Sequence, residues 1–107
     1  QIFELIEAKP QGKKCPAIDG IVKEGQEIIK DYKGSPALDA GLLSAAQSVE
    51  HYEISRYGTL KAWANEMGLK DAVRLLDATL KEEIKTDESL TSLAESVINQ
   101  EAELEAG

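Results

Sequence analysis

Hydrophobic positions towards the C-terminus of the chain recur in alternating steps of three and four residues. Such spacing places side chains along one face of an α-helix. The stripe consists of Leu69, Val73, Leu76, Leu80, Glu83, Asp87, Leu90, Ala94 and Val97. The pattern predicts a long helix that opens near Asp71, with two carboxylates inside its apolar face.

A second stripe with the same spacing precedes the first, and it also contains two acids. Its members are Leu43, Ala46, Glu50, Glu53, Tyr57, Leu60, Ala64 and Met67. The predicted helix begins at Pro36, because proline is tolerated in a first helical turn, and it stops at Gly68, a residue type suited to the left-handed position after a helix. Two long helices joined by so short a turn must lie antiparallel.

The part of the chain before these helices contains two shorter elements. The stretch Ile2–Ala8 is predicted to be a helix already under way at Gln1, because no capping residue precedes it. A connecting helix is expected from Pro16 to about Tyr32, where apolar residues again recur at helical spacing. The acidic tail Gln100–Gly107 is expected to be solvated or disordered.

The composition agrees with a single all-α domain. Aromatic residues make up only 5% of the 107 residues, whereas residues that favour helices are abundant. A net charge of −8 disfavours nucleic acids and anionic membrane surfaces as partners. No apolar run approaches the roughly 20 residues that a membrane span requires. The one cysteine, Cys15, cannot form an internal disulfide, so we expect a cytoplasmic protein.

The four acids of the two stripes lie at one height in the predicted hairpin. Glu50 and Glu53 precede Gly68 by 18 and 15 residues, while Glu83 and Asp87 follow it by 15 and 19. At a rise of ~1.5 Å per residue, both pairs lie about 25 Å from the turn. The carboxylates should therefore face one another across an apolar seam.

Carboxylates in such a place need a partner. Burial and mutual repulsion raise their pKa values, and an uncompensated buried charge is costly. Oxygen-rich sites on helices suit iron, manganese and similar divalent ions, and the facing helices of a bundle are where paired-metal carboxylate sites are built. Basic side chains or protons could instead neutralise the acids, and spacing alone does not decide between these readings.

The residues around these acids resemble the YciE/YciF-type stress-response proteins, a ferritin-like family of bacterial cytoplasmic proteins. The matching segments are Val49–Ile54 (VEHYEI), Tyr57–Leu60 (YGTL), Leu80–Glu83 (LKEE), Thr86–Asp87, Leu90 and the loop from Lys9 to Cys15. The resemblance implies a ferritin-like four-helix bundle with a dinuclear metal centre, found as a homodimer. Residues 1–107 would be the C-terminal portion of that single domain, with its first helix and most of its second preceding Gln1.

The same resemblance implies a ligand set. Glu50 and Glu53 look like the metal ligands of the third bundle helix, and Glu83 and Asp87 look like those of the fourth. Ferritin-like proteins generally carry Glu-x-x-His in the fourth helix, so a spacing of four without histidine departs from that pattern. One chain would hold half a site, and a second copy could supply the rest, because symmetric pairing brings identical surfaces together.

Two further residues are candidates for positions beside the metal. His51 adjoins Glu50, but a helical step of about 100° turns it off the stripe, which favours a surface histidine or one bonded to a ligand over a ligand itself. Tyr57 lies one turn from Glu53 on the inner face. A packed core tyrosine is favoured there over a redox or hydrogen-bonding role near a metal.

The leading hypothesis is therefore a ferritin-like protein of bacterial stress response that holds two iron or manganese ions. Oxidase, peroxidase and iron-handling chemistry all remain open, as does whether the protein is an enzyme, because a bundle does not determine its reaction. The alternative is a non-catalytic helical assembly or interaction protein whose buried acids are neutralised by basic side chains or protons.

Overall fold

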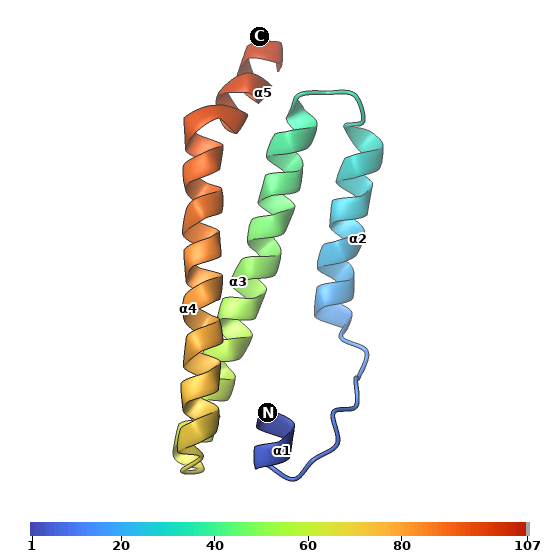
Figure 1. The fold of residues 1–107 in the computed structure, drawn as a ribbon. Coiled ribbons are helices and arrows are strands. Elements are labelled where there is room, and N and C mark those ends of the chain that lie inside the picture. The colour runs from blue at the N-terminus through green and yellow to red at the C-terminus, as the bar shows by residue number, and fades with distance from the viewer. Residues whose placement is uncertain (107) are drawn as a thin grey trace.

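Two long antiparallel helices dominate the fold, as predicted. The computed structural model describes residues 1–106, apart from the side chains of Val97, Glu105 and Ala106. Helix α3 (Ala37–Glu66) and helix α4 (Lys70–Leu93) lie side by side over most of their length (Figure 1). The described residues contain no strand, so the all-α prediction is confirmed.

The turn between α3 and α4 is closed by Gly68. Its φ of +73° lies in the left-handed region that glycine adopts without steric cost. The N–H of Gly68 donates to the carbonyl of Asn65 at 3.1 Å, and the N–H of Leu69 donates to that of Ala64 at 3.0 Å. These bonds satisfy carbonyls that the end of a helix leaves free. The predicted helix end is confirmed.

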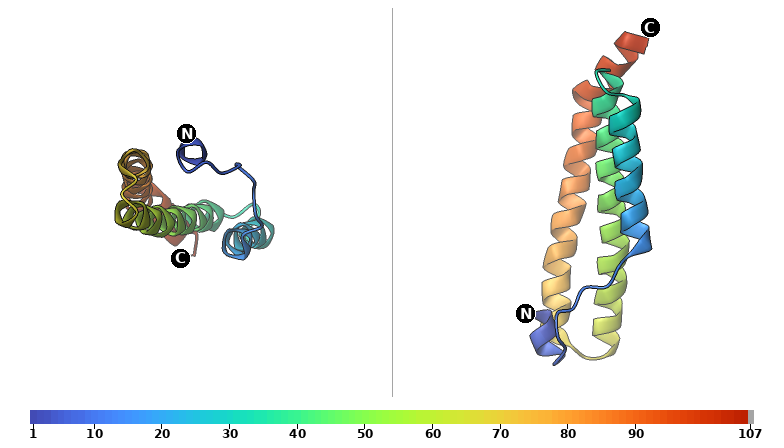
Figure 2. Two further views of the ribbon diagram at one scale, coloured as in Figure 1. Left: turned by 90° about the horizontal axis from the view of Figure 1, so that it is seen from below. Right: turned by 90° about the vertical axis from the view of Figure 1, so that its right-hand side faces the viewer.

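Helix α2 (Pro16–Asp31) packs along the other side of α3 and confirms the predicted connecting helix. Seen end-on, α4, α3 and α2 form one row with α3 in the middle, and α1 (Ile2–Leu5) lies to one side of it (Figure 2). The principal extents of 55 × 27 × 18 Å describe the same flat, elongated shape. The long helices are therefore left with an uncovered face.

The opening helix is shorter than predicted. It ends at Leu5 rather than Ala8, because Glu7 adopts a left-handed φ of 56°. The N–H of Ala8 then donates to the carbonyl of Phe3 at 2.9 Å, which closes the helix end. A glutamate in this conformation costs roughly 1–2 kcal/mol relative to a right-handed one, so no sequence signal marked the site.

The C-terminal part also differs from the prediction. A π-helical turn, η1 (Ala94–Ile98), follows α4, and α5 (Asn99–Ala106) continues as a helix that contacts α3. The chain bends at η1 towards the start of α3 (Figure 1). The tail was expected to be solvated or disordered; it is helical up to residue 106, and its solvation is confirmed by Leu104, which is 80% exposed. Gly107 lies outside the described residues.

The buried core is small, with most of it close to the turn and Leu43 and Ala94 buried towards the other end of the hairpin. Its largest cluster joins Ala64 of α3 to Ala72 and Leu76 of α4, with Ile2, Tyr57, Leu69 and Val73 packed against it. Leu60 and Met67 were predicted on the inner stripe, but they are 45% and 71% exposed. They border an open groove of about 510 Å³ between α1, α3 and α4, lined almost entirely by apolar side chains and called the apolar groove below.

None of the helices in residues 1–106 is long and apolar enough to cross a membrane.

The small core predicts a strong dependence on one leucine. Leu76 is 6% exposed, so Leu76→Ala should lower the free energy of unfolding by about 2–5 kcal/mol through lost burial and the cavity left behind. The matched control is Leu104→Ala in the exposed tail, for which we expect a change within about 0.5 kcal/mol. Chemical denaturation followed by circular dichroism measures both. Equal losses for the two variants would contradict the assignment of the core.

Candidate metal centre

Three glutamates from two helices converge in the middle of the hairpin. Glu50 and Glu53 are supplied by α3, where a spacing of three puts them on one face, and Glu83 is supplied by α4. All three are half-buried, and one carboxylate oxygen from each lies within 4.8 Å of one from each of the others. The structure thus brings together three of the four acids that the sequence singled out.

The proximity of the acids changes their protonation. A hydrogen bond with Glu83 raises the pKa of Glu53 above its usual 4.5, with burial and the charge of Glu83 acting in the same direction. The pKa of Glu83 is raised too, chiefly by its hydrogen bond with Glu50, although its bond with Glu53 opposes the shift. Both shifts have the same physical origin, because neighbouring carboxyl groups disfavour one another's ionised form.

One oxygen of the cluster is unsatisfied. Glu50 Oε2 is buried without a hydrogen-bond partner among the described residues. A buried carboxylate oxygen without a partner carries a desolvation cost of several kcal/mol in charged form, so such groups call for an explanation such as a bound ion.

The arrangement of the donors fits a small divalent cation. Oxygen ligands lie about 2.0–2.1 Å from an ion such as Mg²⁺, and therefore at most about 4.2 Å from one another. The 4.8 Å that bounds the present oxygens is close to this limit, so small side-chain adjustments would complete the contacts. Carboxylates are hard ligands, which suit iron(II), manganese(II) and magnesium better than they suit softer metals.

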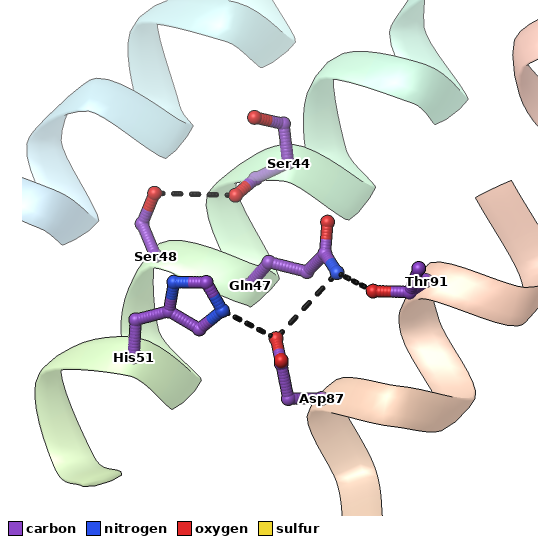
Figure 3. Close-up of polar contacts among 6 residues, drawn as sticks. All are labelled: Ser44, Gln47, Ser48, His51, Asp87 and Thr91. Atoms are coloured by element: carbon purple, nitrogen blue, oxygen red, sulfur yellow. Dashed lines mark hydrogen bonds and ion pairs between the residues drawn. The ribbon is translucent and has the colours of Figure 1, made fainter. Parts of the chain in front are cut away.

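The fourth predicted ligand, Asp87, lies outside this cluster. Its Oδ1 lies 2.8 Å from Nε2 of His51 and accepts a hydrogen bond from Nε2 of Gln47 at 3.5 Å (Figure 3). Gln47 also donates to the hydroxyl of Thr91 at 2.6 Å. Asp87 therefore takes part in a polar contact between α3 and α4, one helical turn from Glu83, and its role as a ligand stays a prediction.

The two residues proposed beside the metal have different surroundings. His51 has a side chain that is 65% exposed, off the apolar stripe, and it bonds to a predicted ligand. Tyr57 is half-buried and packs against the core cluster of Ala64, Ala72 and Leu76 at the edge of the apolar groove. Tyr57 thus lies among packing residues on the side of the site nearer the turn.

The family of this chain follows from its match over almost its whole length. Residues 1–103 match a family described as Domain of unknown function (DUF892). The chain belongs to the DUF892 family. Within DUF892 it is 45% identical to Protein YciF of Escherichia coli over 110 aligned residues, which span 99% of this chain and 66% of YciF.

Solved structures of similar proteins have the same arrangement of helices. The structure of the Escherichia coli stress protein YciF superposes with a TM-score of 0.82 at 41% identity, over 92% of this chain and 64% of that one. YcfI of Rhodopseudomonas palustris, described as a candidate structural protein, gives a TM-score of 0.81 at 47% identity, over 85% and 58%. The chain therefore spans slightly less than two thirds of the length of these DUF892 relatives.

Sequence reasoning missed the two residues that complete the polar contact. Gln47 precedes His51 by four residues, and Thr91 follows Asp87 by four, so each lies one turn along its helix from a residue already singled out. A spacing of four places each pair on one helix face, which could have pointed to Gln47 and Thr91. Neutral polar side chains on a helix are usually solvated, so their presence alone does not indicate a contact between helices.

A separate polar contact joins the start of α2 to α3. The Cys15 thiol lies 2.9 Å from the hydroxyl of Tyr52, whose ring is covered by the Arg56 guanidinium at 5.1 Å. The Tyr52 hydroxyl is the main cause of a lowered pKa of the Cys15 thiol, with backbone groups at the start of α2 contributing. This contact ties the connecting helix to the helix that carries Glu50 and Glu53.

The raised pKa values make the stability of the metal-free protein depend on pH. At a pH between the unfolded value of 4.5 and the raised folded values, the folded state binds more protons at Glu53 and Glu83 than the unfolded state does, so rising pH favours unfolding. The free energy of unfolding should therefore fall as the pH rises above 4.5 and through the raised pKa values. We expect Glu53→Gln to flatten this decline and Glu88→Gln, an exposed control on α4, to leave it unchanged. Urea titrations with chelator across this pH range provide the measurement.

Proposed function

We propose that Glu50, Glu53 and Glu83 hold a divalent cation as part of a ferritin-like dinuclear iron or manganese centre in a stress-response protein. The observation that carries the proposal is the buried, unpartnered oxygen of Glu50 within a cluster of three carboxylates from facing helices. The 45% identity to YciF, a stress protein, supports the cellular role.

The distribution of basic side chains argues against one form of the alternative, in which such side chains neutralise the acids. Among the described residues the ion pairs involve Asp71, Asp77 and Asp87, and none reaches the three glutamates. Lys61 and Lys81 both pair with Asp77, at 2.6 and 2.9 Å. Within the described part of the chain, basic side chains therefore leave the cluster to protons or a metal ion.

Each residue has a distinct task in this proposal. Glu50 and Glu53 supply oxygen ligands from α3, and Glu83 supplies one from α4, so the cation also joins the two helices. Asp87, the proposed fourth ligand, lies one turn away in contact with His51 and Gln47. A carboxylate-held metal pair supplies redox or Lewis-acid chemistry when bound. Oxidase, peroxidase and iron-handling roles are all compatible with it.

The proposal predicts metal-linked stability. Iron(II) or manganese(II) should bind the wild-type chain stoichiometrically and raise the free energy of unfolding by about 2.7 kcal/mol at a free concentration 100 times Kd. Glu50→Gln and Glu83→Gln should each abolish stoichiometric binding, because each removes a charged oxygen ligand. Metal analysis after gel filtration, with thermal denaturation in parallel, measures both effects.

Glu88→Gln is the matched control, since it removes one negative charge from an exposed position of α4. It should bind metal as the wild type does. If neither ion binds at stoichiometric level, the metal proposal fails. The alternative, a non-catalytic assembly protein with protonated acids, then becomes the better account.

We also propose that the protein works as a homodimer in the cytoplasm. The apolar groove is a candidate surface for contact with a second copy, because its large apolar side chains are exposed in the single chain. Trp63 and Met67 are 62% and 71% exposed beside Phe3, which is 46% exposed. Exposed apolar patches of this kind mark protein contacts. A second copy that covers this face would also bring further carboxylates to the half-site.

The dimer is tested by light scattering coupled to gel filtration. The wild type should show twice the chain mass of 11.6 kDa. Trp63→Glu should dissociate the dimer, because it places a charge in the apolar groove. Ser55→Glu, at an exposed position of α3 that does not line the apolar groove, should not. A monomeric mass for the wild type would refute this part of the proposal.

A further inference from the structure

The polar contact around Asp87 connects both long helices beside the glutamate cluster. His51, which contributes from α3, follows Glu50 directly, and Asp87 on α4 follows Glu83 by one turn, a rise of about 6 Å. Figure 3 shows His51 and Gln47 reaching from α3 to the same carboxylate, with Thr91 of α4 beyond. The contact therefore spans the helix interface immediately next to the proposed ligands.

Both contacts with Asp87 involve one of its oxygens. Nε2 of His51 and Nε2 of Gln47 lie 2.8 and 3.5 Å from Oδ1, and among the described residues no hydrogen bond reaches Oδ2. The side chain is only 20% exposed. A carboxylate held at one oxygen in this way keeps a fixed orientation and a second oxygen with free lone pairs.

Gln47 is itself held in place. Its amide nitrogen donates to Thr91 Oγ1 at 2.6 Å, the shortest of the contacts in this group. Because Thr91 lies one turn beyond Asp87 on α4, Gln47 contacts two successive turns of the opposite helix. Such a contact resists both sliding of the helices and rotation of the Asp87 side chain.

We infer that Gln47 and His51 are positioning residues of the proposed metal centre, which contact Asp87 at Oδ1 and leave Oδ2 free to bind a cation held beside Glu83. The inference rests on the proposed function and adds to it the residues that orient the fourth carboxylate. Partners that hydrogen-bond to a metal ligand typically contribute 10–100-fold in metal affinity.

Manganese(II) titration of the full chain tests the inference, with the free ion quantified by its EPR signal. His51→Leu and Gln47→Met remove the donors at similar side-chain volume, and each should weaken binding about 10–100-fold. His51→Gln keeps a donor and should restore most of the affinity. The EPR line shape of the bound ion should change in His51→Leu and return in His51→Gln, which loss of packing alone would not produce.

Ser48→Ala serves as the control. Ser48 lies between Gln47 and His51 on α3, but its hydroxyl donates to the carbonyl of Ser44 at 3.2 Å and does not reach α4 (Figure 3). Wild-type binding combined with affinities within twofold in both donor variants would overturn the inference and leave the proposed function standing. Absence of binding in the wild type would overturn both.

Discussion

The repulsion between carboxylates in the middle of the hairpin is the constraint on which the rest of the structure depends. Glu50, Glu53 and Glu83 lie within 4.8 Å of one another, where full ionisation without a counter-ion is strongly disfavoured. The raised pKa values of Glu53 and Glu83 reflect this crowding, and the stability that their protonated forms contribute is lost as the pH rises through those values. A bound cation would replace those protons and turn a destabilising cluster into a link between α3 and α4.

The placement of the apolar core follows from this constraint. Ala64, Ala72 and Leu76 pack near the turn, where the helices are held by Gly68, and the polar middle of the hairpin adds little burial of its own. Polar contacts between the helices lie beside this core, where Lys61 pairs with Asp77, and beyond the glutamates, where Gln47 bonds to Thr91. Leu43 and Ala94 are buried towards the far end, so packing near both ends and directional contacts between them hold the hairpin.

Much of this could be predicted because it depends on local spacing. Three-and-four periodicity and Gly68 determine the two helices and their turn, and counting from the turn brought Glu50 and Glu53 level with Glu83. Asp87 illustrates the limit of that counting. Its height matches the cluster, but its actual contacts depend on the rotamers of His51 and Gln47, which no spacing rule describes.

Other differences come from tertiary structure. The exposure of Met67 arises because α2, α3 and α4 form a single row, so an inward-facing stripe does not have a partner along its whole length. The left-handed conformation of Glu7 goes against the preference of the residue itself, so local propensity could not predict it.

The π turn η1 has a consequence for comparing this chain with its relatives. A π turn holds one residue more than an α turn, so the angular phase of α5 is shifted from that of α4. If the α-helical period of α4 is extended through Ala94 into the tail, every later residue is assigned to the wrong face of α5. Relatives that lack the turn require a one-residue gap between 94 and 98 before their tails can be aligned.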